Sequence, residues 1–308
     1  MRTKRRPWKV DLPATKSYFV VASLLYKHDK VMKSIILLFA AVMFLGMTVF
    51  AQADIRKVDF KNFTYLAHCA GEDTEKVTVK NGEYSKETKQ DGYTDHFYFE
   101  VRGIAYGDLT GDGKDEAVII TNCNTGGTGQ FTEGFIYAVK VGKPALLARI
   151  PGGDRAYGGL REARIENGLL VVESNDEGEA GGACCPEFIV TSKYKVAGGN
   201  LAAVGSPSRR PVYPSQRVTF ARGTSGSTIT LNIRPNEGKR LIVGARSGQT
   251  LSVALNTDKV TAQLLEDADK TDVDNGFTAK LPKTGDYSIQ LTNYGETDQT
   301  VIVTIKIK

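Results

Sequence analysis

Residues 239–255 read KRLIVGARSGQTLSVAL, two apolar runs joined by an Ala-Arg-Ser-Gly-Gln turn. In the second run Leu251, Val253 and Leu255 alternate with small or polar residues. A period of two places alternate side chains on one face of a β-strand. The segment therefore predicts two β-strands connected by a short turn, and it sets the pattern for the rest of the chain.

Similar runs lie on both sides of this segment, at roughly the spacing of a small β-sandwich. No stretch carries a sustained apolar stripe with a period of 3.6, so we expect little helix. Residues 217–308 are therefore predicted to form a β-sandwich with strands at Arg217–Phe220, Thr228–Ile233, Leu241–Ala245, Thr250–Leu255, Thr261–Leu265, Tyr287–Leu291 and Val301–Ile307.

A Pro- and Ser-rich segment at 205–216 precedes this region and has no apolar periodicity. It predicts a linker. Residues 54–204 again contain β-type runs, and Asn167-Gly168 between two of them is typical of a two-residue hairpin turn. The sequence thus predicts an all-β or β-dominated chain of two domains, with strand runs in the first at His96–Val101, Ala117–Ile120 and Leu169–Val172.

The N-terminal region has the order of an export signal. Met32-Lys33 precede an uncharged apolar run from Ile35 to Phe50, which Ala51-Gln52-Ala53 follow. The run is shorter than the ~20 residues that span a bilayer. We expect a signal peptide at 32–53, a mature chain beginning at Asp54, and a non-native extension at 1–31. The alternative is a retained membrane anchor with residues 1–31 as its cytoplasmic tail.

Removal of residues 1–53 changes the balance of charge. The whole chain has a formal net charge of +5, but the first 53 residues hold nine Lys or Arg and two Asp or Glu, so the mature part carries −2. A nearly neutral chain lacks the excess of cations that neutralises phosphates. We therefore expect no nucleic-acid partner, and no stable membrane insertion once the signal is cleaved.

Four cysteines lie in the predicted mature chain, all before residue 190: Cys69, Cys123, Cys184 and Cys185. An even number in an oxidising compartment predicts two disulfides. Three pairings exist, and the one that joins Cys184 to Cys185 is the least expected because adjacent residues meet disulfide geometry only with strain. A zinc site is the weaker alternative, since it needs two ligand pairs at short spacing.

Residues 108–116, DLTGDGKDE, place oxygen ligands at alternate positions of a tight loop. Such spacing, with glycine at the sixth position, can wrap a calcium ion. The alternative is an Asp- and Gly-rich hairpin turn with solvated charges. The predicted ligands of a structural calcium ion are Asp108, Thr110, Asp112, the carbonyl of Lys114, and Glu116.

This loop resembles the FG-GAP type calcium loop, with Thr110 and Glu116 as departures. The wider segment, including TNCNTGGTG at 121–129, GGDRAYGG at 152–159 and the CCP run at 184–186, resembles bacterial LppP/LprE-like envelope lipoproteins. No lipid-attachment cysteine follows the apolar run here. In GGDRAYGG, Arg155 and Tyr157 have little neighbouring bulk, so we predict an exposed binding pair, the alternative being a tyrosine that folds back onto the core.

Signatures of catalysis are weak. Gly223–Ser227 is not a nucleophile elbow, and the Gly-rich runs at 113–114 and 127–129 lack the residues of phosphate-binding loops. The mature chain has two histidines, His68 and His96. A Ser-His-Asp site is defined by geometry and not by order, so an envelope hydrolase that uses one of these histidines is the alternative to a non-enzyme.

The C-terminal segments 220–233, 239–255 and 281–291 resemble the pre-peptidase C-terminal type β-sandwich, and still more the related modules of periplasmic g-type lysozyme inhibitors. The resemblance implies a non-catalytic binding module. The sequence therefore predicts a periplasmic or secreted, non-catalytic binding protein of the bacterial envelope. Its expected partner is an extracytoplasmic protein such as a lysozyme, or a cell-wall glycan; a purely structural envelope protein is the third possibility.

Overall fold

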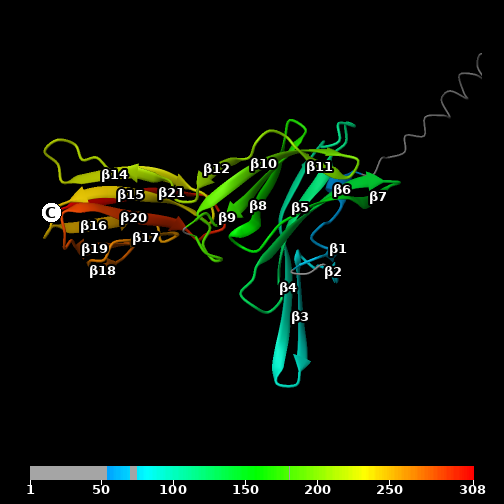
Figure 1. Cartoon of the computed structure of the whole chain (residues 1–308), viewed down its shortest axis with the longest axis horizontal. Coiled ribbons are helices and arrows are strands. Elements are labelled where there is room, and N and C mark those ends of the chain that lie inside the picture. Colours follow the sequence, from blue (N-terminus) through cyan, green and yellow to red (C-terminus); the bar gives the residue numbers. More distant parts are fainter. Residues whose placement is uncertain (1–53, 70–74, 180) are drawn as a thin grey trace, which may run out of the picture. The chain divides into compact units, whose positions relative to one another are not determined.

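The computed structural model describes residues 54–69, 75–179 and 181–308 (Figure 1). The predicted N-terminal extension and signal peptide lie outside these residues. Ala53–Lys308 forms one compact unit. Helix in the described part is limited to a 3-10 turn, η1 (Ile55–Lys57), so the all-β prediction is confirmed. None of the helices in this described part has the length and apolarity to cross a membrane.

The N-terminal region contains two five-stranded sheets and a two-stranded ribbon. One sheet has the order β3-β4-β5-β6-β7 and the other the path β11-β10-β9-β8, with β12 paired to β10. Their bounds are β1 (Thr64–Ala67), β2 (Glu75–Thr78), β3 (Glu83–Gln90), β4 (Tyr93–Gly107), β5 (Glu116–Asn124), β6 (Phe131–Lys140), β7 (Lys143–Ile150), β8 (Tyr157–Glu166), β9 (Leu169–Asp176), β10 (Phe188–Ala197), β11 (Asn200–Ala203) and β12 (Ser208–Pro211).

Strand β5 lies between two hydrophobic cores, which explains its continuous apolar sequence. Ala117, Ile119 and Cys123 face the core that the β1-β2 ribbon and η1 cover, and Val118 and Ile120 face the core shared with the β8–β11 sheet. A strand buried on both faces has no polar alternation. The sequence therefore identified β5 by its β-branched residues and not by its period.

Two hairpins of this region matter for the sequence prediction. Asn167 and Gly168 both have positive φ, at 52° and 74°, and connect β8 to β9, so the predicted hairpin is confirmed.

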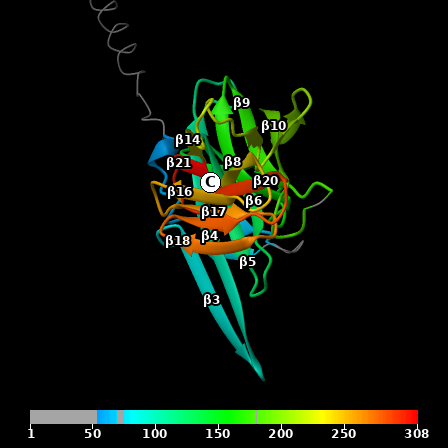
Figure 2. The same ribbon diagram turned by 90° about the vertical axis from the view of Figure 1, so that its left-hand side faces the viewer.

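Strands β3 and β4 pair from Glu83 to Glu100 and extend beyond the other strands (Figures 1 and 2). The residues from Lys86 to Lys89 are exposed, and such charges discourage an edge strand from pairing with another chain.

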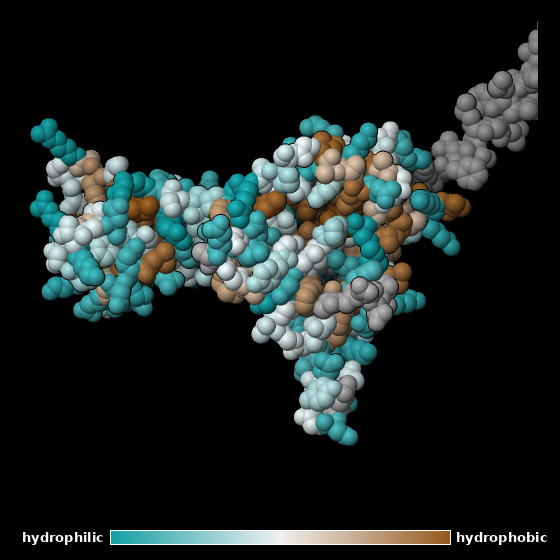
Figure 3. All heavy atoms as spheres, in the orientation of Figure 1, coloured by the Kyte–Doolittle hydropathy of each residue, from teal (hydrophilic) through white to brown (hydrophobic). Residues whose placement is uncertain are grey.

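The C-terminal region is a β-sandwich. Its sheets have the orders β13-β15-β20-β17 and β14-β21-β16-β19-β18, and one core fills the space between them. Figure 3 shows mainly hydrophilic and intermediate residues on its visible face. The strands are β13 (Ser215–Arg217), β14 (Gly226–Ile233), β15 (Glu237–Ala245), β16 (Thr250–Leu255), β17 (Val260–Leu264), β18 (Asp269–Val273), β19 (Gly276–Lys280), β20 (Gly285–Asn293) and β21 (Gln299–Ile307).

Alternation explains the sandwich core. In β21, Val301, Val303 and Ile305 are buried while the residues between them are exposed or half-buried. Each fully buried aliphatic side chain contributes about 1.5–3 kcal/mol of transfer free energy. The Ala-Arg-Ser-Gly-Gln turn carries the chain from β15 in one sheet to β16 in the other, with Gly248 at a φ of 82°.

The structure differs from the predicted strands at three places. Val218–Phe220 is not part of a strand, because β13 ends at Arg217. Strands β18 and β19 were missed; β18 is exposed throughout and carries no apolar alternation. The segment 205–216, predicted as a linker, contains β12 and the start of β13: β12 pairs with β10, and β13 pairs in parallel with β15. Its prolines did not prevent pairing because both strands are short and lie at sheet edges or off the main path.

Candidate binding cleft

A cleft of about 690 Å³ lies where the β8–β9 hairpin and the loops beside it meet the turns of the sandwich. The N-terminal region supplies strand residues and the loop around the Cys184–Cys185 pair, and the sandwich supplies two turns. The lining residues are Arg102, Asn122, Gln130, Thr132, Arg155, Gly159, Leu160, Arg161, Glu162, Asn175, Cys184, Cys185, Pro186, Val212, Tyr213, Arg234, Pro235, Asn236, Thr292, Tyr294 and Asp298.

Arg161 joins the two sides of the cleft. Its Nη1 donates to Asn175 Oδ1 at 3.1 Å, and its Nη2 donates to the Pro235 carbonyl at 3.2 Å and the Asn236 carbonyl at 3.3 Å. Burial lowers the pKa of Arg161, and the nearby carboxylate of Glu237 opposes this shift. The side chain is 12% exposed, so the guanidinium is a fixed part of the cleft and not a mobile surface cation.

Charged side chains continue from Arg161 into a cluster, which we call the charged cluster: Arg161, Glu162, Arg164, Glu173, Arg210, Arg234 and Glu237. Arg234 Nη2 lies 3.1 Å from Glu173 Oε2 and 2.6 Å from Glu162 Oε2. Arg210 binds Glu237 at 2.7 Å. Burial raises the pKa of Glu173, but Arg234 and the other guanidinium groups outweigh it and hold that pKa below its ordinary value. Glu173 thus stays ionised, and the cluster fixes strands of both regions beneath the cleft.

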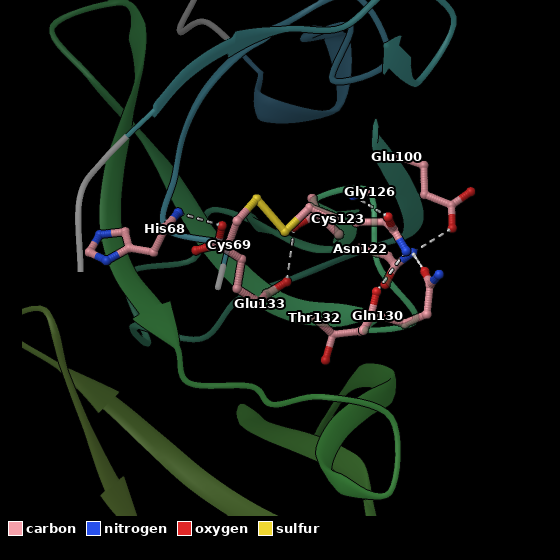
Figure 4. Close-up of a disulfide and its surroundings, with 12 residues drawn as sticks. His68, Cys69, Glu100, Asn122, Cys123, Gly126, Gln130, Thr132 and Glu133 are labelled. Atoms are coloured by element: carbon pink, nitrogen blue, oxygen red, sulfur yellow. Dashed lines mark hydrogen bonds between the residues drawn. A yellow bond between two sulfur atoms is a disulfide. The ribbon is translucent and has the colours of Figure 1, made fainter. Parts of the chain in front are cut away.

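Asn122 on β5 is 3% exposed and presents a buried amide to the cleft. Its Nδ2 donates to Gln130 Oε1 at 2.8 Å and to Glu100 Oε1 at 3.2 Å (Figure 4). Within the described residues its Oδ1 has no hydrogen-bond partner, and the same holds for Arg161 Nε. A buried polar atom without a partner costs about 1–3 kcal/mol. Two residues that line the cleft thus each carry one buried polar atom without a partner, an acceptor on Asn122 and a donor on Arg161.

Of the predicted binding pair, Arg155 lines the cleft and Tyr157 does not. Arg155 lines the cleft, but Asp154 holds its guanidinium at two points, Nε to Oδ1 at 2.9 Å and Nη2 to Oδ2 at 3.0 Å. The Arg155 hydrogen bond also lowers the pKa of Asp154. Tyr157 is 50% exposed and lies outside the residues that line the cleft. Recognition by both side chains stays a prediction from the sequence, and the Tyr157→Ala variant described below tests it against recognition at the cleft.

The glycines around this pair have a packing role. A Cβ on Gly152 would overlap the carbonyl of Thr132, and one on Gly153 would overlap that of Tyr157. The Gly-rich run therefore reflects close approach of two backbone segments, not simply the lack of neighbouring bulk that the sequence suggested.

The structure pairs all four cysteines, and Cys69–Cys123 confirms the prediction of a disulfide in this region. The pairs are Cys69–Cys123 and Cys184–Cys185, and the expectation that the second was the least favoured pairing is wrong. Cys123 faces the core beneath the β1-β2 ribbon, where Cys69 reaches it at a Cα separation of 5.8 Å (Figure 4). Cys184 and Cys185 lie on the cleft wall after β9, away from the core that contains Cys123, so each of them pairs with its neighbour in the sequence.

The predicted calcium loop connects β4 to β5 and closes on its own amides. Asp108 accepts from Gly111 N at 2.6 Å and Gly113 N at 2.8 Å, and Glu116 accepts from Leu109 N at 2.8 Å. The Gly113 amide is the largest cause of the lowered pKa of Asp108, whereas burial raises the pKa of Glu116.

This arrangement does not gather the predicted ligands around one point. In residues 54–69, 75–179 and 181–308, no three or more His, Cys, Asp or Glu side chains are grouped so as to hold a metal ion. Asp112 instead accepts from the amide of Lys114 at 2.9 Å, and Thr110 lies beside Glu116. The geometry fits a hydrogen-bonded turn, and the calcium ion stays a prediction.

The two histidines have different surroundings. The backbone N–H of His68 donates to Glu133 Oε1 at 2.9 Å, and its ring points away from the disulfide (Figure 4). His96 lies on the β3-β4 hairpin, with Nδ1 3.5 Å from Glu87 Oε1 and a side chain that is 57% exposed. Neither contact pairs an imidazole with a hydroxyl nucleophile.

Sequence reasoning missed most of the cleft, because its residues come from separate strands and turns. The available signals were polar residues that follow apolar runs within strands, such as Asn122 in β5 and Asn175 in β9, which alone suggest only a buried polar contact.

Comparison with known proteins gives limited matches. No family model and no curated protein matches the chain. Among solved structures, the chain is similar to three periplasmic inhibitors of g-type lysozyme, each aligned with 31% of this chain. PliG of Aeromonas hydrophila is 16% identical over 97% of its own length with a TM-score of 0.28. PliG of Salmonella Typhimurium is 19% identical over 98% (TM-score 0.27), and a mutant of the Escherichia coli protein is 16% identical over 99% (TM-score 0.27). At these TM-scores the similarity assigns neither fold nor function, and the LppP/LprE and FG-GAP resemblances stay predictions.

Proposed function

We propose that this chain is an exported, non-catalytic binding protein of the bacterial envelope, which captures its partner in the cleft between the β8–β9 hairpin and the sandwich turns. The observation that carries the proposal is the cleft itself. Its volume of about 690 Å³ lies in the range of ligand pockets, and its walls combine aromatic, amide and guanidinium groups. The charged cluster holds cleft residues such as Arg161 and Arg234 in place before a partner binds, which reduces the entropy cost of binding.

The partner is an extracytoplasmic protein or a cell-wall glycan. The resemblance of residues 217–308 to g-type lysozyme inhibitors names g-type lysozyme as the first protein to test. Tyr294 at the cleft is 70% exposed, and exposed tyrosines supply large contact area with a polar tip. Such a residue suits contact with either kind of partner.

Binding assays with the exported protein test this function. The protein is titrated against g-type lysozyme and incubated with insoluble peptidoglycan, alongside Tyr294→Ala and the matched variant Tyr157→Ala. We expect Tyr294→Ala to weaken capture at least tenfold and Tyr157→Ala to leave it within twofold. If only Tyr157→Ala weakens capture, recognition lies at the Gly-rich run 152–159 and the cleft is rejected as the site.

The hydrolase alternative has its own test. The exported protein and its His68→Ala/His96→Ala variant are assayed for release of soluble fragments from peptidoglycan. We expect no release by either protein. Release by the wild type that the double variant lacks would identify an enzyme and overturn the non-catalytic proposal.

A further inference from the structure

We infer that the cleft takes a neutral oligosaccharide, with a sugar ring against Tyr294 and the Cys184-Cys185-Pro186 wall, and with sugar hydroxyls turned toward Asn122 and Arg161. This inference rests on the proposed function and names the ligand class of that same site. Three observations carry it: the pairing of the cleft's charges, the two unused polar atoms, and the flat apolar surfaces at the wall.

The charges of the cleft are already neutralised within the protein. Arg155 is held by Asp154, Arg161 lies 3.5 Å from Glu237, and Arg234 binds Glu162 and Glu173. Arg102 lies 3.7 Å from Glu100. An anionic ligand would have to displace one of these carboxylates, and it would also meet the exposed carboxylate of Asp298. The site therefore favours a ligand without net charge.

The unused polar atoms match hydroxyl groups. Asn122 Oδ1 can only accept a hydrogen bond and Arg161 Nε can only donate one, and both are buried without a partner among the described residues. A hydroxyl both donates and accepts, so one kind of ligand group satisfies either atom. The low local dielectric strengthens hydrogen bonds made there. Closely spaced hydroxyls are the defining feature of a saccharide.

The wall of the cleft offers flat surfaces with few polar atoms. Tyr294 and Pro235 come from the sandwich, and Cys184, Cys185 and Pro186 from the loop after β9. Disulfide sulfurs and proline rings make only weak hydrogen bonds, if any. The loop is fixed because Cys185 N donates to the Gly182 carbonyl at 2.9 Å and Ala156 N donates to the Ala183 carbonyl at 3.2 Å. The C–H face of a pyranose packs on surfaces of this kind, as it does on aromatic rings.

The test is calorimetric titration of the exported protein with neutral chito-oligosaccharides and malto-oligosaccharides, and with oligogalacturonates of equal length. We expect at least one neutral series to bind and the uronates to bind at least tenfold more weakly. Tyr294→Ala should weaken neutral binding at least tenfold, Tyr294→Phe should retain it within threefold, and Tyr157→Ala should leave it unchanged.

Two sets of outcomes overturn the inference. Absence of binding by both neutral series, or preference for the uronates, rejects the ligand class. Equal binding by the wild type and Tyr294→Ala rejects the position, and the unused atoms of Asn122 and Arg161 are then satisfied by trapped water only. If g-type lysozyme or peptidoglycan binds in a Tyr294-dependent way and no neutral saccharide does, the inference fails and the proposed function stands. If nothing binds, both fail.

Discussion

Glu173 is the most enclosed carboxylate of the charged cluster, with a side chain that is 6% exposed. Arg164, Arg210 and Arg234 all lie within 3.5 Å of its oxygens. Removing one partner from a buried group leaves uncompensated charge, which costs 3–5 kcal/mol when every partner is buried. Since these arginines are about a third exposed, we expect Glu173→Gln to lower the free energy of unfolding by about 2 kcal/mol.

Urea unfolding measures this effect, with Glu166→Gln as the control. Glu166 also pairs with Arg164, but its side chain is 45% exposed, so we expect a loss of at most about 0.5 kcal/mol. Equal losses in the two variants would show that burial does not strengthen the cluster.

The pKa of Glu173 makes stability depend on pH. Because the folded-state pKa lies below the ordinary value of 4.5, the folded protein binds fewer protons than the unfolded chain as the pH falls past that value. The contribution of Glu173 is fully present above about pH 4.5 and is lost as the pH falls through the folded pKa. Unfolding curves between pH 6 and pH 3 should therefore show a decline that is smaller in Glu173→Gln. A parallel decline in both proteins would assign the acid sensitivity to other carboxylates.

Asp108 shows how one side chain closes a loop. Its two oxygens accept from Gly111 and Gly113, so Asp108→Ala leaves both amides without an acceptor and should lower the melting temperature in chelator. The calcium hypothesis adds a second expectation, that millimolar calcium raises the melting temperature of the wild type and not of Asp112→Ala. Identical melting of the wild type in chelator and in calcium would leave only the hydrogen-bonded turn.

At the scale of elements, the two disulfides should differ in what they contribute. Cys69 and Cys123 are 54 positions apart and tie the segment after β1 to β5, whereas Cys184 and Cys185 are neighbours. A cross-link stabilises mainly by limiting the unfolded chain, more so for a longer loop. We expect Cys69→Ala/Cys123→Ala to cost about 2–4 kcal/mol and Cys184→Ala/Cys185→Ala about 1 kcal/mol or less. Guanidinium unfolding of both variants checks the order, and a reversed order would contradict the loop argument.

Strands with a clear pattern could be predicted from the sequence, and strands without one could not. Thr250–Leu255 was predicted to the residue because it has one buried and one open face. Strand β18 was missed because it is held by pairing with β19 and not by burial of its own side chains. Strand β12 was taken for linker because its partner β10 lies at a distance in sequence, and local propensity contains no information about that partner.

The candidate cleft was less predictable for the same reason. Arg155 was identified from its Gly-rich loop, but Asn122, Arg161 and Tyr294 are brought together only by the packing of separate elements. The pairing of Cys184 with Cys185 was misjudged because local strain was weighed without knowing that Cys123 faces another core. Tertiary placement decided each of these cases.

At the scale of the whole described unit, the N-terminal sheets and the sandwich are joined by the segment 208–217 and by the charged cluster. In this segment β12 pairs with β10 of the N-terminal region and β13 pairs with β15 of the sandwich. Arg161 and Arg234 reach from one region to backbone or carboxylate groups of the other. Because these contacts form only when both regions are folded, we expect calorimetry of the protein to show a single unfolding transition near neutral pH. Arg161→Met/Arg234→Met should lower its temperature and broaden or split it. Two well-separated transitions in the wild type would contradict this coupling.

The strand pairing of residues 208–217 has a consequence for proteases. A protease active site takes in a stretch of extended chain whose amides and carbonyls are free, and cleavage concentrates at exposed loop tips. The backbone between β12 and β13 is also hydrogen-bonded. The Val212 N–H donates to the Glu187 carbonyl at 3.0 Å, and the Val212 carbonyl accepts from the Gly238 N–H at 3.2 Å. The Pro214 carbonyl accepts from the Arg240 N–H at 3.1 Å. Limited digestion should therefore cut the exposed tip of the β3-β4 hairpin before it cuts this connection, and the sandwich should not be released as a soluble fragment while the protein is folded.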